Sequence, residues 1–150
     1  MVGGVQVVVP CEMLQGEGQV EATATPECSA EEESRQRQSI EEIARSTENR
    51  LADHLTIADL QAARQAFQTG VDPAGRKHLQ EVLEAAGGQL DDTKRLRNLQ
   101  DYLIPRGGCS PSLTARLNGV LQRANNVLKR VDEHFPEWRE AYRLIYGKGP

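Results

Sequence analysis

Apolar residues recur every three or four positions along most of the chain after residue 29, and this spacing is typical of amphipathic α-helices. Ser29, with Glu32 three residues later, has the pattern of a capped helix N-terminus. Because residues 33–39 are all polar, the first helix starts either at Ser29 or nearer Ser39. Its apolar face carries Ile40, Ile43, Leu51 and Leu55.

Two further helices are predicted in the middle of the chain, each between a capping residue and glycine. Thr56 predicts the start of one helix, and Gly70 predicts its end. Residues 72–73 are Asp-Pro, which predicts another start because proline loses no hydrogen bond in the first turn. The glycine pair at 87–88 predicts that this helix stops there.

The rest of the chain predicts three more helices. Asp91 or Asp92 caps a fourth helix, which ends before Pro105. The Ser-Pro pair at 110–111 begins the longest helix, which carries a wide apolar face. A short last helix follows within residues 136–147.

These segments predict an all-α fold, an irregular bundle of five or six helices, with residues 29–150 forming the helical domain. Residues 1–28 differ in pattern. VQVVV at 5–9 is β-branched, and residues 19–25 alternate between two faces, with a glycine-rich turn at 16–18. This region is therefore an N-terminal arm, either loose or folded as a β-hairpin.

Length and composition fit one domain: 150 residues, of which 38% are hydrophobic and 27% charged. No apolar run approaches the ~20 residues that cross a bilayer, and the chain starts without a basic leader. We therefore expect a cytoplasmic protein without membrane contact; export by a leaderless route is an open alternative.

The chain has three cysteines, Cys11, Cys28 and Cys109. An odd number argues against a complete disulfide framework, and the spacing matches no metal motif. We expect three ordinary thiols, with a Cys11–Cys28 bond as the alternative outside the cytoplasm. Cys109 stands just before a predicted helix start, where the helix dipole would lower the pKa of a thiol. No histidine spacing supplies it with a base, so we do not expect catalysis there.

Charge is unevenly distributed around the net value of −4. Residues 1–60 hold twelve acidic side chains and four arginines, whereas residues 61–150 hold ten acidic and fourteen basic ones. In the basic run 94–130, three arginines recur at seven-residue steps and so share one helix face: Arg116, Arg123 and Arg130. Either the acidic and basic halves attract each other within the fold, or this face meets an anionic partner.

Residues 66–83 loosely resemble a helix-turn-helix, with Gly70 at the turn. Its second helix would present Arg76, Lys77 and Gln80, residue types that contact phosphates and base edges. Arg76 departs from the motif, because it stands where an apolar residue is expected. No metal-ligand motif and no glycine-rich phosphate loop occurs, so we expect no metal and no cofactor.

The sequence therefore favours a non-enzymatic helical binding or regulatory protein that acts through contacts with a protein partner. The predicted partner-binding residues are Arg116, Arg123, Arg130, Trp138 and Tyr142. The wide apolar face of the longest helix also suggests a homo-oligomer. Two alternatives stay open: a regulator that binds nucleic acid through residues 66–83 and the basic face, and a small toxin-like enzyme domain.

Overall fold

The computed structural model describes residues 28–70 and 72–150, and within them the chain is all helical, without strands. The elements are α1 (Ala30–Asp53), α2 (Ile57–Thr69), α3 (Pro73–Leu103), the 3-10 turn η1 (Ile104–Arg106), α4 (Pro111–His134) and α5 (Trp138–Tyr146). The predicted all-α bundle is confirmed. The arm or hairpin expected over residues 1–28 lies almost wholly outside the described residues, and the division at residue 28 stays a prediction.

The starts of α1 to α4 lie at the capping residues that the sequence predicted. Ser29 Oγ accepts the Glu32 N–H at 3.0 Å, so α1 begins at the earlier of its two predicted starts. Thr56 caps α2 in the same way, Asp72 caps α3, and Ser110 caps α4. Each cap satisfies a backbone donor that has no partner within the helix.

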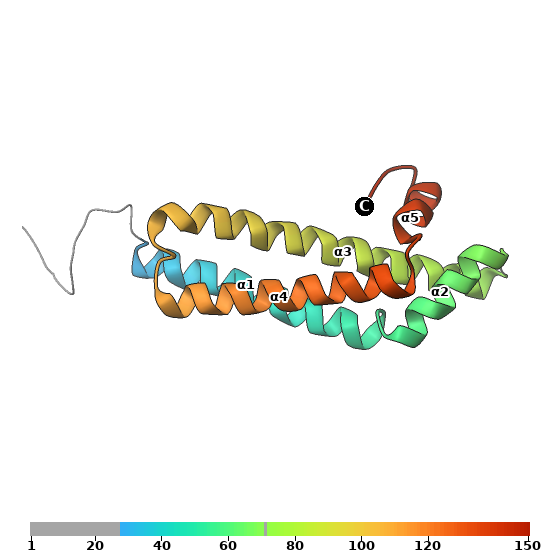
Figure 1. Cartoon of the computed structure of the whole chain (residues 1–150), viewed down its shortest axis with the longest axis horizontal. Helices are drawn as coiled ribbons and strands as arrows, with labels where there is room; N and C mark the ends of the chain where they lie inside the picture. Colours follow the sequence, from blue (N-terminus) through green and yellow to red (C-terminus); the bar gives the residue numbers. More distant parts are fainter. Residues whose placement is uncertain (1–27, 71) are drawn as a thin grey trace, which may run out of the picture.

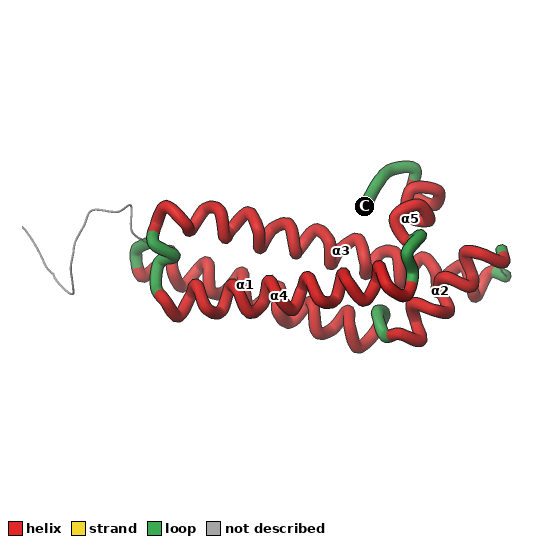
Figure 2. The backbone as a smooth tube through the Cα atoms, viewed as in Figure 1, coloured by secondary structure: helices red, strands yellow, loops and turns green. Residues whose placement is uncertain are grey.

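Three long helices, α1, α3 and α4, lie side by side, and α3 runs opposite to the other two (Figure 1). A short loop follows α1, and α2 then packs beside the first half of α3 (Figure 2). The short helix α5 packs on α3 near that same end. One half of the molecule is thus built from α1, α3 and α4, and the other from α2, α3, α4 and α5.

The core has two apolar clusters, one in each half. The first joins α2, the first half of α3, the second half of α4 and α5, and includes the fully buried Phe135 and Trp138. The second joins α1, the second half of α3 and the first half of α4, and includes the fully buried Ile40 and Leu113. Leu96 and Leu103 supply the α3 side of this second cluster.

A polar layer joins the middle of α3 to α1. Arg50 donates to Asp92 at 2.8 Å and to Gln89 at 3.1 Å. Gln89 in turn donates to Thr47 at 3.1 Å, and both of these side chains are fully enclosed. Buried polar groups are costly unless they are paired, so this layer favours one register of α1 against α3.

The glycine pair at 87–88 does not end a helix, so the stop predicted there and the cap predicted at 91–92 are both wrong: α3 continues unbroken to Leu103. A Cβ atom on Gly87 would stand 2.9 Å from the ring of Tyr142, and one on Gly88 would stand 3.2 Å from the guanidinium of Arg50. The glycines are therefore sites of close approach by α5 and α1. These contacts offset a helix-propensity cost of about 1 kcal/mol per glycine.

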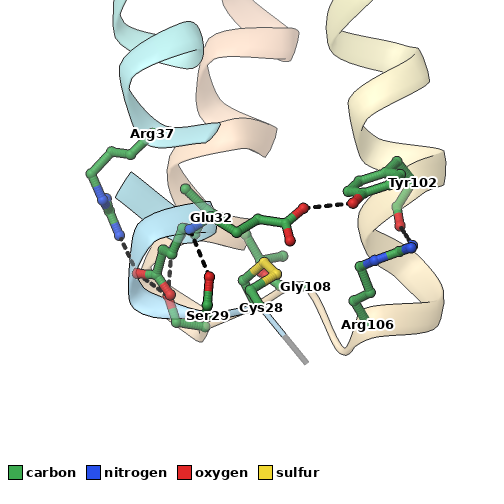
Figure 3. Close-up of a disulfide and its surroundings, with 12 residues drawn as sticks. Cys28, Ser29, Glu32, Arg37, Tyr102, Arg106 and Gly108 are labelled. Carbon is green, nitrogen blue, oxygen red and sulfur yellow. Dashed lines mark hydrogen bonds and ion pairs between the residues drawn. A yellow bond between two sulfur atoms is a disulfide. The ribbon is translucent and has the colours of Figure 1, made fainter. Parts of the chain in front are cut away.

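A disulfide joins Cys28, just before α1, to Cys109 in the turn between α3 and α4 (Figure 3). The two residues are 81 apart in sequence, and their Cα atoms are 5.2 Å apart. The expectation of three ordinary thiols is therefore wrong, and so is the alternative Cys11–Cys28 bond. The pairing arises because α1 and α4 run in the same direction, which brings their N-terminal ends together.

The same end of the bundle carries a second link between α1 and α3. The hydroxyl of Tyr102 donates to the Glu32 carboxylate at 2.5 Å, as Figure 3 shows. This hydrogen bond lowers the pKa of Glu32. The guanidinium of Arg106 lies 3.8 Å from the centre of the Tyr102 ring and donates to the backbone carbonyl of Tyr102. The disulfide thus joins the turn that holds Cys109 to the start of α1, and the contacts of Arg106 join it to Tyr102 in α3.

Candidate binding surface

The arginine face predicted on α4 is largely occupied by α1. Arg116 donates to both carboxylate oxygens of Glu41 at 2.6 and 2.7 Å, and Arg123 does the same to Glu48 at 2.8 and 3.0 Å. These hydrogen bonds hold the pKa of both carboxyl groups below their ordinary value. The interpretation that the acidic and basic halves attract each other is confirmed for these two pairs. Arg130 is half-buried and forms no ion pair with another described residue.

The aromatic residues predicted to meet a partner have contacts within the fold. Trp138 is fully buried, and its indole N–H donates to Asp132 at 2.8 Å. Tyr142 is half-buried, with its ring against Gly87. A direct partner contact by these two residues, or by the three arginines of the α4 face, stays a prediction.

The helix-turn-helix candidate forms the junction of α2 and α3. Arg76 and Lys77 are exposed near the start of α3, whereas Gln80 is half-buried. The hydroxyl of Tyr146 donates to the Gln80 carbonyl at 3.4 Å and to the Glu84 carboxylate at 2.9 Å, so α5 lies against this face of α3. Burial raises the pKa of Tyr146 to about 12, and the hydrogen bond to Glu84 acts in the same direction. Contact between these residues and nucleic acid stays a prediction.

The sulfur of Cys109 is bonded to Cys28 and so offers no thiolate for nucleophilic chemistry. Within residues 28–70 and 72–150, no group of three or more His, Cys, Asp or Glu side chains is placed to hold a metal ion. No helix in that part of the chain is both long and apolar enough to cross a bilayer.

A basic hollow of about 440 Å³ lies between α3 and α4 where α5 joins them. Four cationic side chains line this hollow, and none forms an ion pair with another described residue: Lys94, Arg97, Lys129 and Arg139. One acidic side chain, Asp132, also lines the hollow, and it accepts the indole N–H of Trp138. Arg97 is held in place by a 2.7 Å hydrogen bond to Asn125.

A second hollow, of about 310 Å³, opens between the same two helices near their connecting turn. Its lining includes the buried Leu103 and Leu117, while Ile104 at its edge is 68% exposed. Gln100 donates to Asn118 at 2.9 Å, and both residues also line this hollow. We refer to it as the apolar hollow.

Both hollows belong to one seam between α3 and α4, which we call the α3–α4 groove. Lys94 in the basic hollow and Ile104 in the apolar hollow are ten residues apart on the chain, which corresponds to about 15 Å along a helix. The hydrogen bonds Arg97–Asn125 and Gln100–Asn118 cross the seam between these points. The groove therefore offers cationic contacts and apolar contacts along about 15 Å of the seam.

No protein-family model, no curated protein and no solved structure matches this chain.

Proposed function

We propose that this is a non-enzymatic binding protein that acts through protein–protein contacts, and that the α3–α4 groove is the surface it uses. One observation carries the proposal: four cations gather around the basic hollow without an ion-pair partner among the described residues. Like charges held together repel one another, so such a cluster favours an anionic partner. The adjacent exposed Ile104 adds an apolar contact of the kind that anchors protein interfaces.

The arrangement favours a protein over nucleic acid as the partner. The cations form one local cluster on a chain whose net charge is −4, whereas a duplex presents phosphates over a long, uniformly charged surface. The alternative of a regulator that binds nucleic acid through Arg76, Lys77 and Gln80 is tested with the same protein and a DNA duplex.

The Cys28–Cys109 bond supports a location different from the cytoplasm expected from the sequence. Structural disulfides persist in oxidising compartments and are rare in the reducing cytosol. We therefore place the working protein in an oxidising environment. Alkylation of free thiols in freshly lysed cells tests this proposal: Cys28 and Cys109 should be protected before reduction and labelled after it, and labelling before reduction would contradict the placement.

Peptide selection tests the binding function without a known partner. Random peptides displayed on phage are selected against the full-length, oxidised protein and then compared on two variants. Lys94→Glu/Lys129→Glu reverses two charges in the basic hollow. Arg35→Glu/Arg45→Glu makes the same change in charge on exposed positions of α1. We expect enriched clones that bind the wild type and the α1 variant but lose binding to the groove variant.

Two results would refute the proposal. Selection that enriches nothing above the bare support contradicts peptide binding by this protein. Enriched clones that bind the groove variant as well as the wild type contradict the assignment of the surface.

A further inference from the structure

From the two hollows, we infer that the partner's docking segment is acidic and carries one apolar anchor, with its carboxylates in the basic hollow and the anchor in the apolar hollow. This inference rests on the proposed binding function. It goes beyond that function because it specifies the side chains that the partner must present and the distance between them.

The basic hollow is arranged for carboxylates. Two of its cations have partners that limit their motion: Arg97 is hydrogen-bonded to Asn125, and the guanidinium of Arg139 lies 5.1 Å from the centre of the Trp138 ring. Arginine held in this way presents its planar fork to a carboxylate with less loss of side-chain freedom on binding. Lys94 and Lys129 are exposed and supply two more charges with flexible reach.

The apolar hollow is arranged for one aliphatic or aromatic side chain. Leu103 and Leu117 are each only 2% exposed and belong to the core, so they form the floor of the hollow. The adjoining Gly107 adds no side chain, and the largely exposed Ile104 has surface left to bury. Burying an apolar anchor here removes apolar surface from water, which favours binding.

The separation of the hollows sets the pattern of the partner. About 15 Å corresponds to ten residues of an α-helix and to four or five residues of an extended chain. A segment with acidic residues alone leaves the apolar hollow empty, and one with its apolar residue next to them spans less of the distance between Lys94 and Ile104. The spacing of charge and anchor is therefore a feature that the groove can recognise.

The test uses labelled synthetic peptides and fluorescence anisotropy with the full-length, oxidised protein. Two peptides place a Glu-Glu pair and a Phe about 15 Å apart, one by ten positions in an alanine-rich helix and one by four positions in an extended sequence. Matched peptides replace Glu-Glu with Gln-Gln, or Phe with Ser. We expect at least one of the two designed peptides to bind, each replacement to weaken its binding by about tenfold or more, and added salt to weaken the Glu peptide most.

Protein variants connect each part of the peptide to its hollow. Lys94→Gln/Lys129→Gln should weaken binding of the Glu peptide but leave the Gln peptide unchanged. Ile104→Ser, at a position with few packing contacts to lose, should weaken the Phe peptide but leave the Ser peptide unchanged. Arg35→Gln/Arg45→Gln on α1 is the control and should change neither.

The inference and the proposed function can fail separately. Selected phage peptides that need the groove but contain no acidic residues would overturn the inference and leave the binding function standing. Designed peptides whose affinity ignores the Glu-to-Gln change would also overturn it. Binding of a 20-base-pair DNA duplex that is tighter than that of the designed peptides and is lost in Lys94→Gln/Lys129→Gln would assign the groove to nucleic acid and overturn both.

Discussion

Removing the Cys28–Cys109 bond should cost this protein a large share of its stability. The bond closes a loop over a sequence separation of 81 residues. In the loop-entropy description, a closed loop of this length raises the free energy of unfolding by about 4.5 kcal/mol at 25 °C. Domains of this size are typically stable by only about 5–15 kcal/mol, so the bond decides whether the bundle is robust or marginal.

The double variant Cys28→Ala/Cys109→Ala is unfolded in urea, and the loss of helix is monitored by circular dichroism. The midpoint should fall sharply against the wild type, while Cys11→Ala, which keeps both bridging cysteines, should unfold like the wild type. Cys109 has a backbone φ of 66°, where a Cβ atom costs about 1–2 kcal/mol. Replacing Cys109 with Gly instead of Ala in the double variant should therefore recover part of the loss.

Two outcomes would refute this reasoning. A double variant with an unchanged midpoint would mean that the bond is absent from the folded protein or contributes nothing to its stability. If alanine and glycine at position 109 gave equal midpoints, the left-handed backbone at that residue would be contradicted.

Three further comparisons test the packing and the polar contacts. Gly119→Ala, where a Cβ meets nothing within 4 Å, should raise the free energy of unfolding by about 1 kcal/mol in a thermal melt. Gly87→Ala should raise it less, because its Cβ would lie 2.9 Å from the ring of Tyr142 in α5. Equal increases for the two variants would contradict that contact. Arg50→Met should cost about 2 kcal/mol in denaturant unfolding, because Asp92 and Gln89 lose a donor and Asp92 keeps only the exposed Arg95 as a partner. Adding Asp92→Leu should recover much of this loss, and a double variant no better than the single would contradict the polar layer. Glu48→Gln should lose less than about 1 kcal/mol at neutral pH, because the pair is solvent-exposed. The ion pair lowers the pKa of Glu48 in the folded protein. The difference in unfolding free energy between the wild type and Glu48→Gln should therefore shrink as the pH falls through that pKa. A difference independent of pH would contradict the ion pair.

Helix starts could be predicted from the sequence because their causes are local. Ser29, Thr56, Asp72 and Ser110 each bond to a backbone N–H three residues later, and that relation can be read directly from neighbouring letters. The apolar periodicity likewise predicted the wide apolar face of α4, which packs into the core.

The uninterrupted helix α3 could not be predicted, because its cause lies far away in the sequence. Gly87 and Gly88 have the local pattern of a helix stop, but Tyr142 from α5 and Arg50 from α1 occupy the space that their missing side chains leave. The cysteine pairing could not be predicted for the same reason. No residue near Cys28 or Cys109 in the sequence indicates that packing brings their Cα atoms to within 5.2 Å of each other.

The candidate surface was visible in the sequence only as a surplus of positive charge over residues 94–130. Seven-residue spacing drew attention to Arg116 and Arg123, which the fold pairs with α1. The groove instead gathers Lys94 and Lys129 from two antiparallel helices, together with Arg139, which lies beyond that run. Only the register of α3 against α4 reveals the cluster, and that register depends on tertiary packing.

The most direct test of the account is to map where the acidic, Phe-bearing peptide binds. In nitrogen–proton correlation spectra of the labelled full-length protein, titration should shift the amide signals of residues 94–104 and of the facing part of α4, from Asn118 to Lys129. Signals of α1 and of the segment between α2 and α3 should stay in place. Shifts that cluster on α1 or at that turn, or a spectrum that does not change at saturating peptide, would contradict the assignment of the α3–α4 groove as the binding surface.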